Sequence, residues 1–213
     1  MAVQRELTPA QRITALFIRL AEKQAASVKR AVANKRAAME RARLIYYANP
    51  ARKKEYMARV KHDLAALRKN SVTKNSAMKE AQSFMRVVAA LYESCDVKNG
   101  VLALRTRPIF INYMERRYAL GKIRASIEFK RRGGSEGIRI AHPDNGYPIH
   151  PHGGNWLCPG NMHYVLKSDA KAHRWANVAA TVYTLLHTYT PGGAPHSIGQ
   201  WDSEPLHDAV KNL

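Results

Sequence analysis

No glycine or proline occurs between Ala10 and Ala48. These two residues are the strongest helix breakers, so the stretch predicts one continuous helix of about 40 residues. The residues before it carry a start signal: Thr8 can cap the first turn, Pro9 suits the first helical position, and Gln11 can reach back to the cap. Any fold of this chain therefore has to accommodate a long, rod-like helix.

A second helix follows the first directly. Asn49-Pro50 ends the long helix, because the residue before a proline disfavours helical backbone, and it starts the next helix with Asn49 as cap. The second helix is expected to run to about Lys69. Its apolar residues recur at spacings of three and four, as one side of a helix requires. They are Tyr56, Val60, Leu64 and Leu67.

The rest of the chain also favours helices. Start and stop signals predict a third helix from about Ser76 to Glu93, a fourth from Pro108 to Gly121, a fifth from Ser168 and a short last one after Ser203. Residues 123–129 alternate apolar and polar side chains, so a short strand competes with helix there. The many Gly, Pro, Asn and His residues within 133–166 predict an irregular loop there. The predicted fold is mainly α: a long basic N-terminal helix-turn-helix arm, then a small helical C-terminal domain with a long Gly/Pro/His-rich loop.

Charge divides the chain into two parts. The sequence has 35 Lys and Arg against 16 Asp and Glu, a net charge of +19. Residues 1–70 hold 17 basic and five acidic residues, whereas residues 135–213 hold five basic and six acidic ones. We therefore predict a basic arm over 1–70 and a packing or assembly domain over 71–213. Such a charge indicates nucleic acid or an anionic membrane surface as the partner. The sequence contains no run of about 18 apolar residues, so we expect no transmembrane segment.

The distal part of the long helix combines cations with small side chains. From Ala25 to Ala42 the inward-spaced positions are mostly alanine, which buries little apolar area. Such a helix gains little from a conventional core, but its backbone can come close to a bulky surface. Cations surround the helix, and acids that could pair with them at i,i+4 are scarce. Phosphates would neutralise such a ring of cations and release counterions.

We therefore predict that the arm binds nucleic acid. The candidate contacts are Arg12, Arg19, Lys23, Lys29, Arg30, Lys35, Arg36, Arg41, Arg43, Arg52, Lys53, Lys54, Arg59, Lys61, Arg68 and Lys69. Two other interpretations are a solvated, salt-bridged helix and a calmodulin-target or membrane-surface helix. The scarcity of acids disfavours the first, and the scarcity of large apolar anchors disfavours the second. The basic half has no zinc finger, RNA-recognition signature or helix-turn-helix glycine pattern, so binding is expected to be independent of sequence.

The C-terminal half raises the question of a metal site. Metal-competent side chains gather within 22 residues of the predicted loop, and zinc takes such nitrogen and sulfur ligands. They are His142, His150, His152, Cys158 and His163. Their spacing matches no standard finger or knuckle, and the alternative is that they hydrogen-bond the irregular backbone. A more specific form of the metal-site hypothesis is a nuclease that holds a cation through Asp144 or through His150 and His152. We predict no metal, no cofactor and no enzymatic activity. Cys95 and Cys158 are expected to be unpaired.

The layout resembles the coat proteins of archaeal filamentous viruses, the rudivirus and lipothrixvirus group. The matching features are the basic, alanine-rich helix up to Ala48, the Asn49-Pro50 break with a second basic helix, and the C-terminal part, which is near-neutral and expected to be mostly helical. In that family, helical C-terminal domains stack on one another. The resemblance is architectural, and the loop is a departure from it. It implies that the N-terminal helices wrap double-stranded DNA, that the chain self-assembles in a filament, alone or with a second, paralogous coat protein, and that it resides in the virion after assembly in the host cytoplasm.

The leading hypothesis is therefore a structural protein that packages double-stranded nucleic acid, with DNA favoured. The alternative is an organellar or lineage-specific ribosomal or ribonucleoprotein component, which is also basic, helical and alanine-rich. A third is a DNA-processing enzyme that uses the His/Cys loop. The capped, glycine-free helix favours coating a regular duplex over threading irregular RNA.

Overall fold

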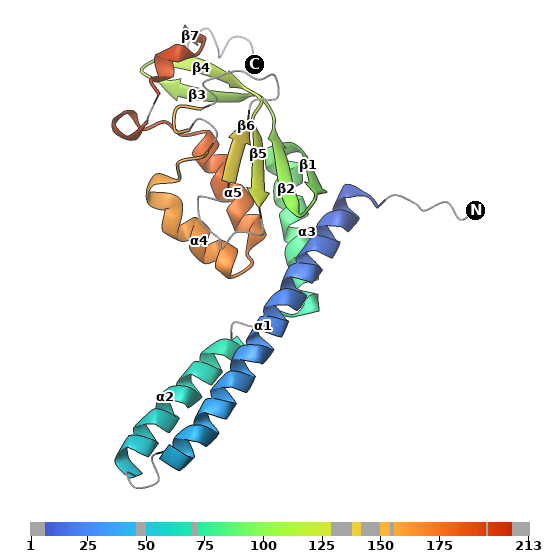
Figure 1. Ribbon diagram of the computed structural model, residues 1–213. Helices are drawn as coiled ribbons and strands as arrows, with labels where there is room; N and C mark the ends of the chain where they lie inside the picture. Colours follow the sequence, from blue (N-terminus) through green and yellow to red (C-terminus); the bar gives the residue numbers. More distant parts are fainter. Residues whose placement is uncertain are drawn as a thin grey trace, which may run out of the picture. The chain divides into compact units, whose positions relative to one another are not determined.

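The computed structural model describes residues 7–45, 50–69, 72–128, 138–141, 150–153, 156–194 and 196–205. Two compact units form, one from Phe17–Met78 and the other from Met1–Leu16 with Lys79–Leu213 (Figure 1). We call the first the hairpin unit and the second the α+β unit. The long N-terminal helix begins in the α+β unit and continues into the hairpin unit.

The predicted first helix is confirmed. α1 runs over Pro9–Ile45, with the proline in its first position. The Gln11 N–H donates to Thr8 Oγ1 at 3.3 Å, and the Thr8 N–H donates to Gln11 Oε1 at 2.9 Å. This is the reciprocal capping box that the sequence predicts, and it satisfies donors at the helix start that have no partner within the helix.

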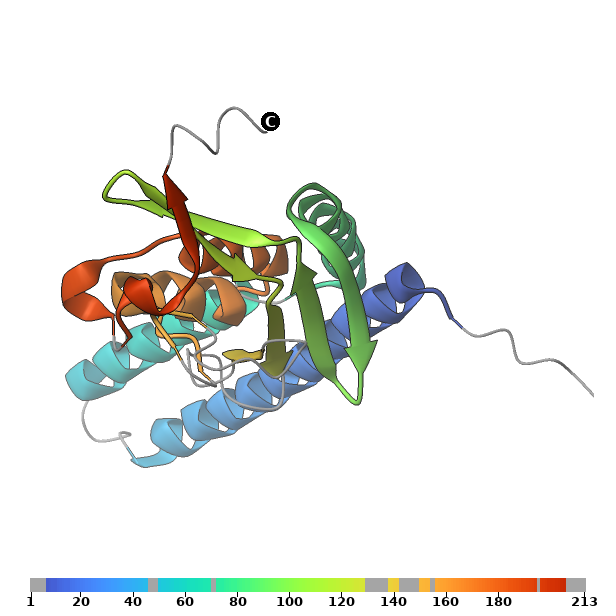
Figure 2. The ribbon, with the colours of Figure 1, turned by 90° about the horizontal axis from the view of Figure 1, so that it is seen from above.

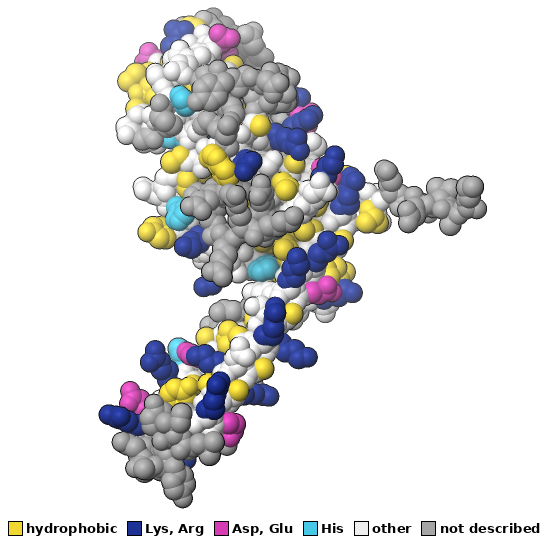
Figure 3. Space-filling view, viewed as in Figure 1, with side chains coloured by type: hydrophobic (Ala, Val, Ile, Leu, Met, Phe, Trp, Pro, Cys, Tyr) yellow, Lys and Arg dark blue, Asp and Glu magenta, His cyan; other side chains and the backbone are white. Residues whose placement is uncertain are grey.

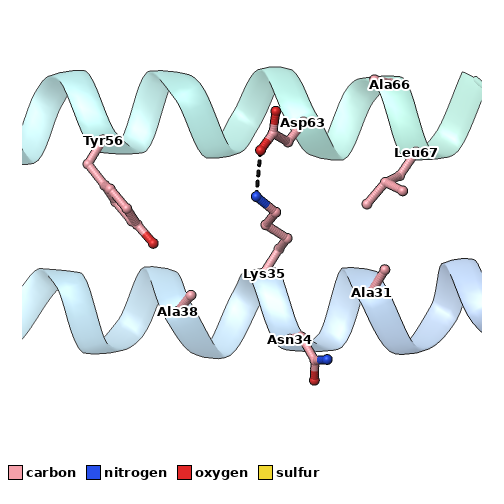
Figure 4. A pocket seen from close by; sticks show the side chains of 8 residues that line it. All are labelled: Ala31, Asn34, Lys35, Ala38, Tyr56, Asp63, Ala66 and Leu67. Atoms are coloured by element: carbon pink, nitrogen blue, oxygen red, sulfur yellow. Dashed lines mark hydrogen bonds and ion pairs between the residues drawn. The ribbon is translucent and has the colours of Figure 1, made fainter.

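The second helix is confirmed as well. α2 runs over Pro50–Lys69 and begins at the proline, while the predicted cap, Asn49, lies outside the described residues. α1 and α2 lie side by side and form a helical hairpin (Figures 1 and 4). The hairpin unit therefore consists mainly of two long helices joined near residue 48.

α3 (Lys74–Leu91) carries one of the buried faces of the α+β unit. Thr73 and Ser76 cap each other at its start: the Ser76 N–H donates to Thr73 Oγ1 at 3.1 Å, and the Thr73 N–H donates to Ser76 Oγ at 2.9 Å. Phe84 and Val88 on this helix are 0 % and 4 % exposed. The predicted third helix is thus confirmed, and it begins two residues before Ser76.

Four strands form an antiparallel sheet in the α+β unit, in the order β1-β2-β5-β6. They are β1 (Tyr92–Lys98), β2 (Val101–Thr106), β5 (Arg124–Glu128) and β6 (Ile138–Ala141). β1 and β2 are joined by the predicted turn at Asn99-Gly100, where both residues have positive φ. Glycine adopts this conformation without strain. Of the two alternatives for residues 123–129, the strand is the one that forms.

One face of this sheet and two helices form the core of the α+β unit. Leu102 and Leu104 on β2 are fully buried. α3 and α5 (Trp175–Leu186) lie on the same side of the sheet (Figures 1 and 2). The Tyr92 hydroxyl donates to the Ala179 carbonyl at 2.7 Å, which ties β1 to α5.

A second antiparallel sheet replaces the fourth predicted helix. It has the order β3-β4-β7, with β3 (Ile109–Tyr113), β4 (Arg116–Gly121) and β7 (Ser203–Pro205). The helix predicted from Pro108 to Gly121 is wrong, because burial there has the period of a strand. Ile109 and Ile111 are buried, whereas Phe110 between them is 39 % exposed. The proline precedes a strand, and Gly121 ends one.

The last predicted helix is also wrong where the structure describes it. Ser203–Pro205 pair with Arg116–Tyr118 as the third strand of the second sheet. A three-residue strand of this kind depends on a partner more than 80 residues away, which no local pattern reveals. Residues 206–213 of the predicted helix lie outside the described residues.

The predicted fifth helix is divided in two. α4 (His163–Lys171) precedes α5, and the backbone breaks at His173, where φ is +57°. The apolar face predicted for this region is confirmed on α5, where Val178 and Val182 are buried. Glu80 of α3 accepts a hydrogen bond from the Ala176 N–H at 2.7 Å and so satisfies a donor at the start of α5.

The mainly α fold predicted from the sequence is therefore wrong. The described residues form five α-helices and seven strands in two antiparallel sheets, an α+β fold. The C-terminal part is built on sheets rather than on helices alone, and the predicted irregular loop contains β6. Among the described residues, no helix is both long enough and apolar enough to cross a membrane.

Candidate nucleic-acid interface

The hairpin unit is strongly cationic. Phe17–Met78 contains 16 Lys and Arg against four acids, a net of +12. Figure 3 shows Lys and Arg side chains along the whole length of this unit. The exposed ones are Arg19, Lys23, Lys29, Arg30, Arg36, Arg41, Arg52, Lys54, Arg59, Lys61 and Lys74. Most of the predicted contact residues are thus available to a partner.

Six exposed cations of α1 fall into two rows. Each residue turns an α-helix by about 100°, so side chains that share a direction form a row along the axis. The first row holds Arg19, Lys23, Arg30 and Arg41, and the second holds Lys29 and Arg36. The side of α1 that faces α2 is marked by Ala31 and Ala38 (Figure 4). Neither row points toward α2, so both rows can meet a partner outside the hairpin.

Few acids neutralise these rows. Lys35 Nζ lies 2.5 Å from Asp63 Oδ2, which joins α1 to α2. This hydrogen bond from Lys35, together with its charge, holds the pKa of Asp63 below its usual value of 3.8, so the carboxylate is ionised at neutral pH. Within the part of the chain that the structure describes, Lys29, Arg30 and Arg36 form no ion pair. Lys35 therefore holds the hairpin together, while the rows keep their charge.

A groove of about 630 Å³ lies between the two helices. Figure 4 shows that Tyr56 and Leu67 reach from α2 toward α1, on which Ala31 and Ala38 also line the groove. The Lys35–Asp63 pair crosses the middle of the groove. The residues lining it are Ala31, Asn34, Lys35, Ala38, Tyr56, Asp63, Ala66 and Leu67. The helices are therefore spaced by the larger side chains of α2.

This groove corrects the predicted role of the alanines. The sequence suggests that the small residues from Ala25 to Ala42 let the helix backbone approach nucleic acid. Ala31 and Ala38 instead face α2, so the hairpin uses them itself. Ala25 is exposed, and the side chain of Ala42 lies outside the described residues. The close-approach argument therefore fails at the two central positions, and the cation rows alone support the interface.

The remaining predicted contacts have different surroundings. Arg12 belongs to the α+β unit, where its Nη2 lies 3.1 Å from Asp96 Oδ1 of β1. Lys53 is half-buried on α2. The side chains of Arg43, Arg68 and Lys69 lie outside the described residues. Arg12 is therefore apart from the rows, and its salt bridge ties the start of α1 to β1.

Two histidines considered as metal ligands bind the backbone. His150 is fully buried: its Nε2 donates to the Leu186 carbonyl at 3.1 Å, and its Nδ1 accepts from the His152 N–H at 3.1 Å. The Nε2 of His152 accepts from the Thr190 N–H at 3.0 Å. Burial lowers the pKa of His150 from 6.5 to about 4, so the ring is neutral at pH 7. These rings hold the chain segment around residue 150 against the end of α5.

The described residues do not assemble a metal site. No group of three or more His, Cys, Asp or Glu among them could hold an ion. Cys95 is half-buried, Cys158 is exposed, and both thiols are free. His142 and Asp144 lie outside the described residues. The described geometry gives the metal-dependent nuclease hypothesis no support.

Comparisons of the chain with protein-family models, with curated proteins and with solved structures find no match. The function has to be argued from the charge and geometry of the chain itself.

Proposed function

We propose that the hairpin unit binds double-stranded nucleic acid along its phosphate backbones without reading the base sequence. The observation that carries the proposal is the pair of cation rows on α1, which are exposed, point away from α2 and are largely free of acidic partners. Like charges in rows repel one another in water, and they bind strongly to a regular array of negative charges.

The dimensions of the hairpin fit a duplex. α2 has 20 residues and is therefore about 30 Å long. A duplex carries one negative charge per about 1.7 Å of axis, which gives roughly 18 phosphate charges over that length. The hairpin unit holds 16 Lys and Arg, which is fewer than these phosphates, and its net charge is +12. The charge of such a stretch of duplex therefore exceeds the positive charge of the hairpin unit.

The rows support positioning rather than base readout. Both Lys and Arg occur in the rows, in no regular order. Contacts of this kind fix a protein on the phosphate backbone and carry no sequence information directly. The binding is therefore governed by charge and salt.

The more specific proposal, that copies of the chain coat a duplex in a filament like the archaeal viral coat proteins, rests on the hairpin alone. The resemblance implies helical C-terminal domains, and the α+β fold removes that part of the match. The basic helical hairpin is the part of the resemblance that the described structure keeps.

Titration of the full chain against labelled duplexes of unrelated sequence tests the binding proposal. We expect dissociation constants that agree within a small factor, and an affinity that falls with salt with a logarithmic slope of about −5 or steeper. Affinity that does not change with salt, or one sequence bound roughly 1,000-fold tighter than the others, would contradict it. Parallel titrations with duplex RNA establish which polymer is preferred.

Electron microscopy of the chain with long duplex tests the coat proposal separately. Regular filaments with a helical repeat would support it. Irregular or isolated complexes would overturn the coat assembly and leave the binding proposal intact, because the two rest on different properties of the chain.

A further inference from the structure

The outer face of the four-stranded sheet carries a second group of cations. Strand register places Arg105 of β2 directly opposite Arg124 of β5. On β6, Arg139 pairs with Ser126, which puts it diagonally next to Arg124. All three arginines are exposed. We call Arg105, Arg124 and Arg139 the arginine face.

The direct pairing of Arg105 with Arg124 is unfavourable in the isolated protein. Directly opposite residues in an antiparallel pair have Cβ atoms about 5 Å apart, and like charges there destabilise the sheet. Within the described part of the chain, Arg124 has no hydrogen-bond or ion-pair partner. The pKa of Glu93 is held below its usual 4.5 mainly by the hydrogen bond from Lys122, and the charge of Arg105 adds a smaller effect in the same direction. Glu93 is thus already paired, and the repulsion on the arginine face is left in place.

The surroundings of the arginines leave room for an anion. Three neighbouring outward positions hold small side chains: Ala103 and Ser126 are half-buried, and Ala141, opposite Arg124, is exposed. Register also places Glu128 of β5 on this face, opposite Val101, and its side chain lies outside the described residues. Asp96 lies on the same face at the far edge of the sheet and is paired with Arg12. Arg105 and Arg124 are therefore flanked mainly by small side chains, whereas the Arg139 guanidinium lies over the Trp156 ring. The arginines span β2, β5 and β6, about 10 Å across the sheet, which suits a short run of phosphates.

An exposed aromatic ring adjoins the arginine face. Trp156 forms an isolated β-bridge with Arg139 and is 39 % exposed. The Arg139 guanidinium carbon lies 4.6 Å from the centre of the Trp156 ring, which holds the indole next to the charges. Proteins that bind single strands combine cations along the backbone with aromatic rings on which bases stack. A duplex keeps its bases stacked inside, so a ring in this place favours an unpaired base.

We propose that the arginine face and Trp156 bind a single strand of nucleic acid, with phosphates on the three arginines and a base on the indole. This site lies in the α+β unit and goes beyond the duplex binding proposed for the hairpin unit. The two can stand or fall independently, because they use different residues and different forms of the polymer.

The test uses the full chain with the hairpin rows weakened by Lys29→Gln, Arg30→Gln, Arg36→Gln and Arg41→Gln. Binding of a short labelled oligothymidine and a matching oligouridine is measured by fluorescence anisotropy at several salt concentrations. In this background, Arg105→Gln, Arg124→Gln and Arg139→Gln together should lower affinity about tenfold or more and flatten the salt slope by roughly two units. Trp156→Ala should lower affinity about tenfold.

The matched control is Lys79→Gln, Arg86→Gln and Lys171→Gln, which removes the same charge from exposed positions on α3 and α4. We expect little change in affinity from it. A loss as large as that of the arginine triple would overturn the proposal, as would no loss from the arginine triple. If Trp156→Ala has no effect, or the same effect on an abasic strand, the site is a plain polyanion surface open to acidic peptides, and the single-strand proposal is wrong.

A thermal measurement keeps the proposal testable if the triple variant is poorly folded. Arg124→Gln alone relieves the Arg105–Arg124 repulsion and should raise Tm by about 1–2 °C without nucleic acid. The oligonucleotide should raise Tm more in the unsubstituted protein than in this variant. A lower Tm for Arg124→Gln, or an equal rise with ligand in both proteins, would contradict the site.

Discussion

Each of the two units is stabilised internally by different interactions. The α+β unit buries apolar side chains between a sheet and two helices, and Leu102, Leu104 and Phe84 are fully buried there. The hairpin unit has a groove between its helices, lined by three alanines and crossed by an ion pair. The comparison shows that most of the net charge lies in one unit and most of the dense apolar packing lies in the other. The unit that carries most of the charge has little apolar packing along the groove, and the unit with the dense core carries less charge.

The largest difference in stability should be seen between two variants. One loses a core side chain of the α+β unit, and the other loses a groove side chain of the hairpin unit. Leu104→Ala leaves a cavity under the four-stranded sheet and should lower the free energy of unfolding by about 2–5 kcal/mol. Leu67→Ala removes a half-buried side chain beside an existing groove and should cost roughly 1 kcal/mol. Chemical denaturation gives both values. Equal losses would break the comparison between the units.

The next effect is a pH dependence that belongs to the α+β unit. The folded protein holds His150 neutral with a pKa of about 4, against 6.5 in the unfolded chain. The unfolded state therefore binds more protons between these values, so stability is full above about pH 7 and falls as pH drops from 6.5 to 4. The loss should reach roughly 3 kcal/mol at pH 4. Denaturation at a series of pH values measures it.

One variant separates this dependence from other titrations. His150→Asn should flatten the curve between pH 6.5 and 4, because it removes the buried ring whose pKa is lowered. Burial also lowers the pKa of His173, which adds a contribution of the same sign in the upper part of this window. Asp63 and Glu93 have pKa values below their usual ones, so their contributions are lost only at lower pH. An unchanged curve for His150→Asn would contradict the assignment.

Charge removal from the hairpin should come third and act on binding alone. Arg30→Gln, Arg36→Gln and Arg41→Gln together should weaken duplex binding on the order of 100-fold at low salt and flatten the salt slope by about three units. These exposed side chains contribute little to folding, so Tm should barely change. The Lys79, Arg86 and Lys171 control triple should keep most of the affinity. A slope that stays the same in the hairpin triple would mean that the rows do not contact phosphates.

The smallest effect distinguishes the two roles considered for the alanines. Ala31→Leu with Ala38→Leu should fill part of the groove and stabilise the hairpin by about 1 kcal/mol, leaving duplex binding unchanged. Hydrogen exchange of α2 amides measures local stability. Ala26→Leu with Ala33→Leu, at exposed positions of α1, is the control and should give no gain. Weaker duplex binding without stabilisation would mean that the alanines lie against nucleic acid after all.

The helices were predictable because their signals are local. Caps and breakers such as Thr8, Gln11 and Pro50 act within a few residues, and the structure confirms the helices they start. Pro108 and Gly121 were misleading, because the same residues also bound strands. The β-branched and aromatic residues of 109–113, which strands favour, were the better signal. β7 could not be found locally, since it exists through its pairing with β4.

The candidate sites differ in the same way. The cation rows follow from helical periodicity and the scarcity of acids, both of which can be read along the sequence. The Lys35–Asp63 pair joins residues 28 positions apart, so its partner depends on how the two helices align. The arginine face requires the register of β2, β5 and β6, which sequence periodicity does not supply. The sequence offers a signal only for Arg124, which lies at a polar position of the alternating residues 123–129.

The groove between α1 and α2 has a consequence for how such a hairpin can be tuned. Because Tyr56 and Leu67 reach from α2 toward α1 in this groove, we expect the spacing of the two helices to depend on a few side chains that carry no charge. Enlarging or trimming them would change how far the cations of α2 stand from those of α1 while every charge stays in place. The spacing of the cations and their number can therefore be changed by separate mutations.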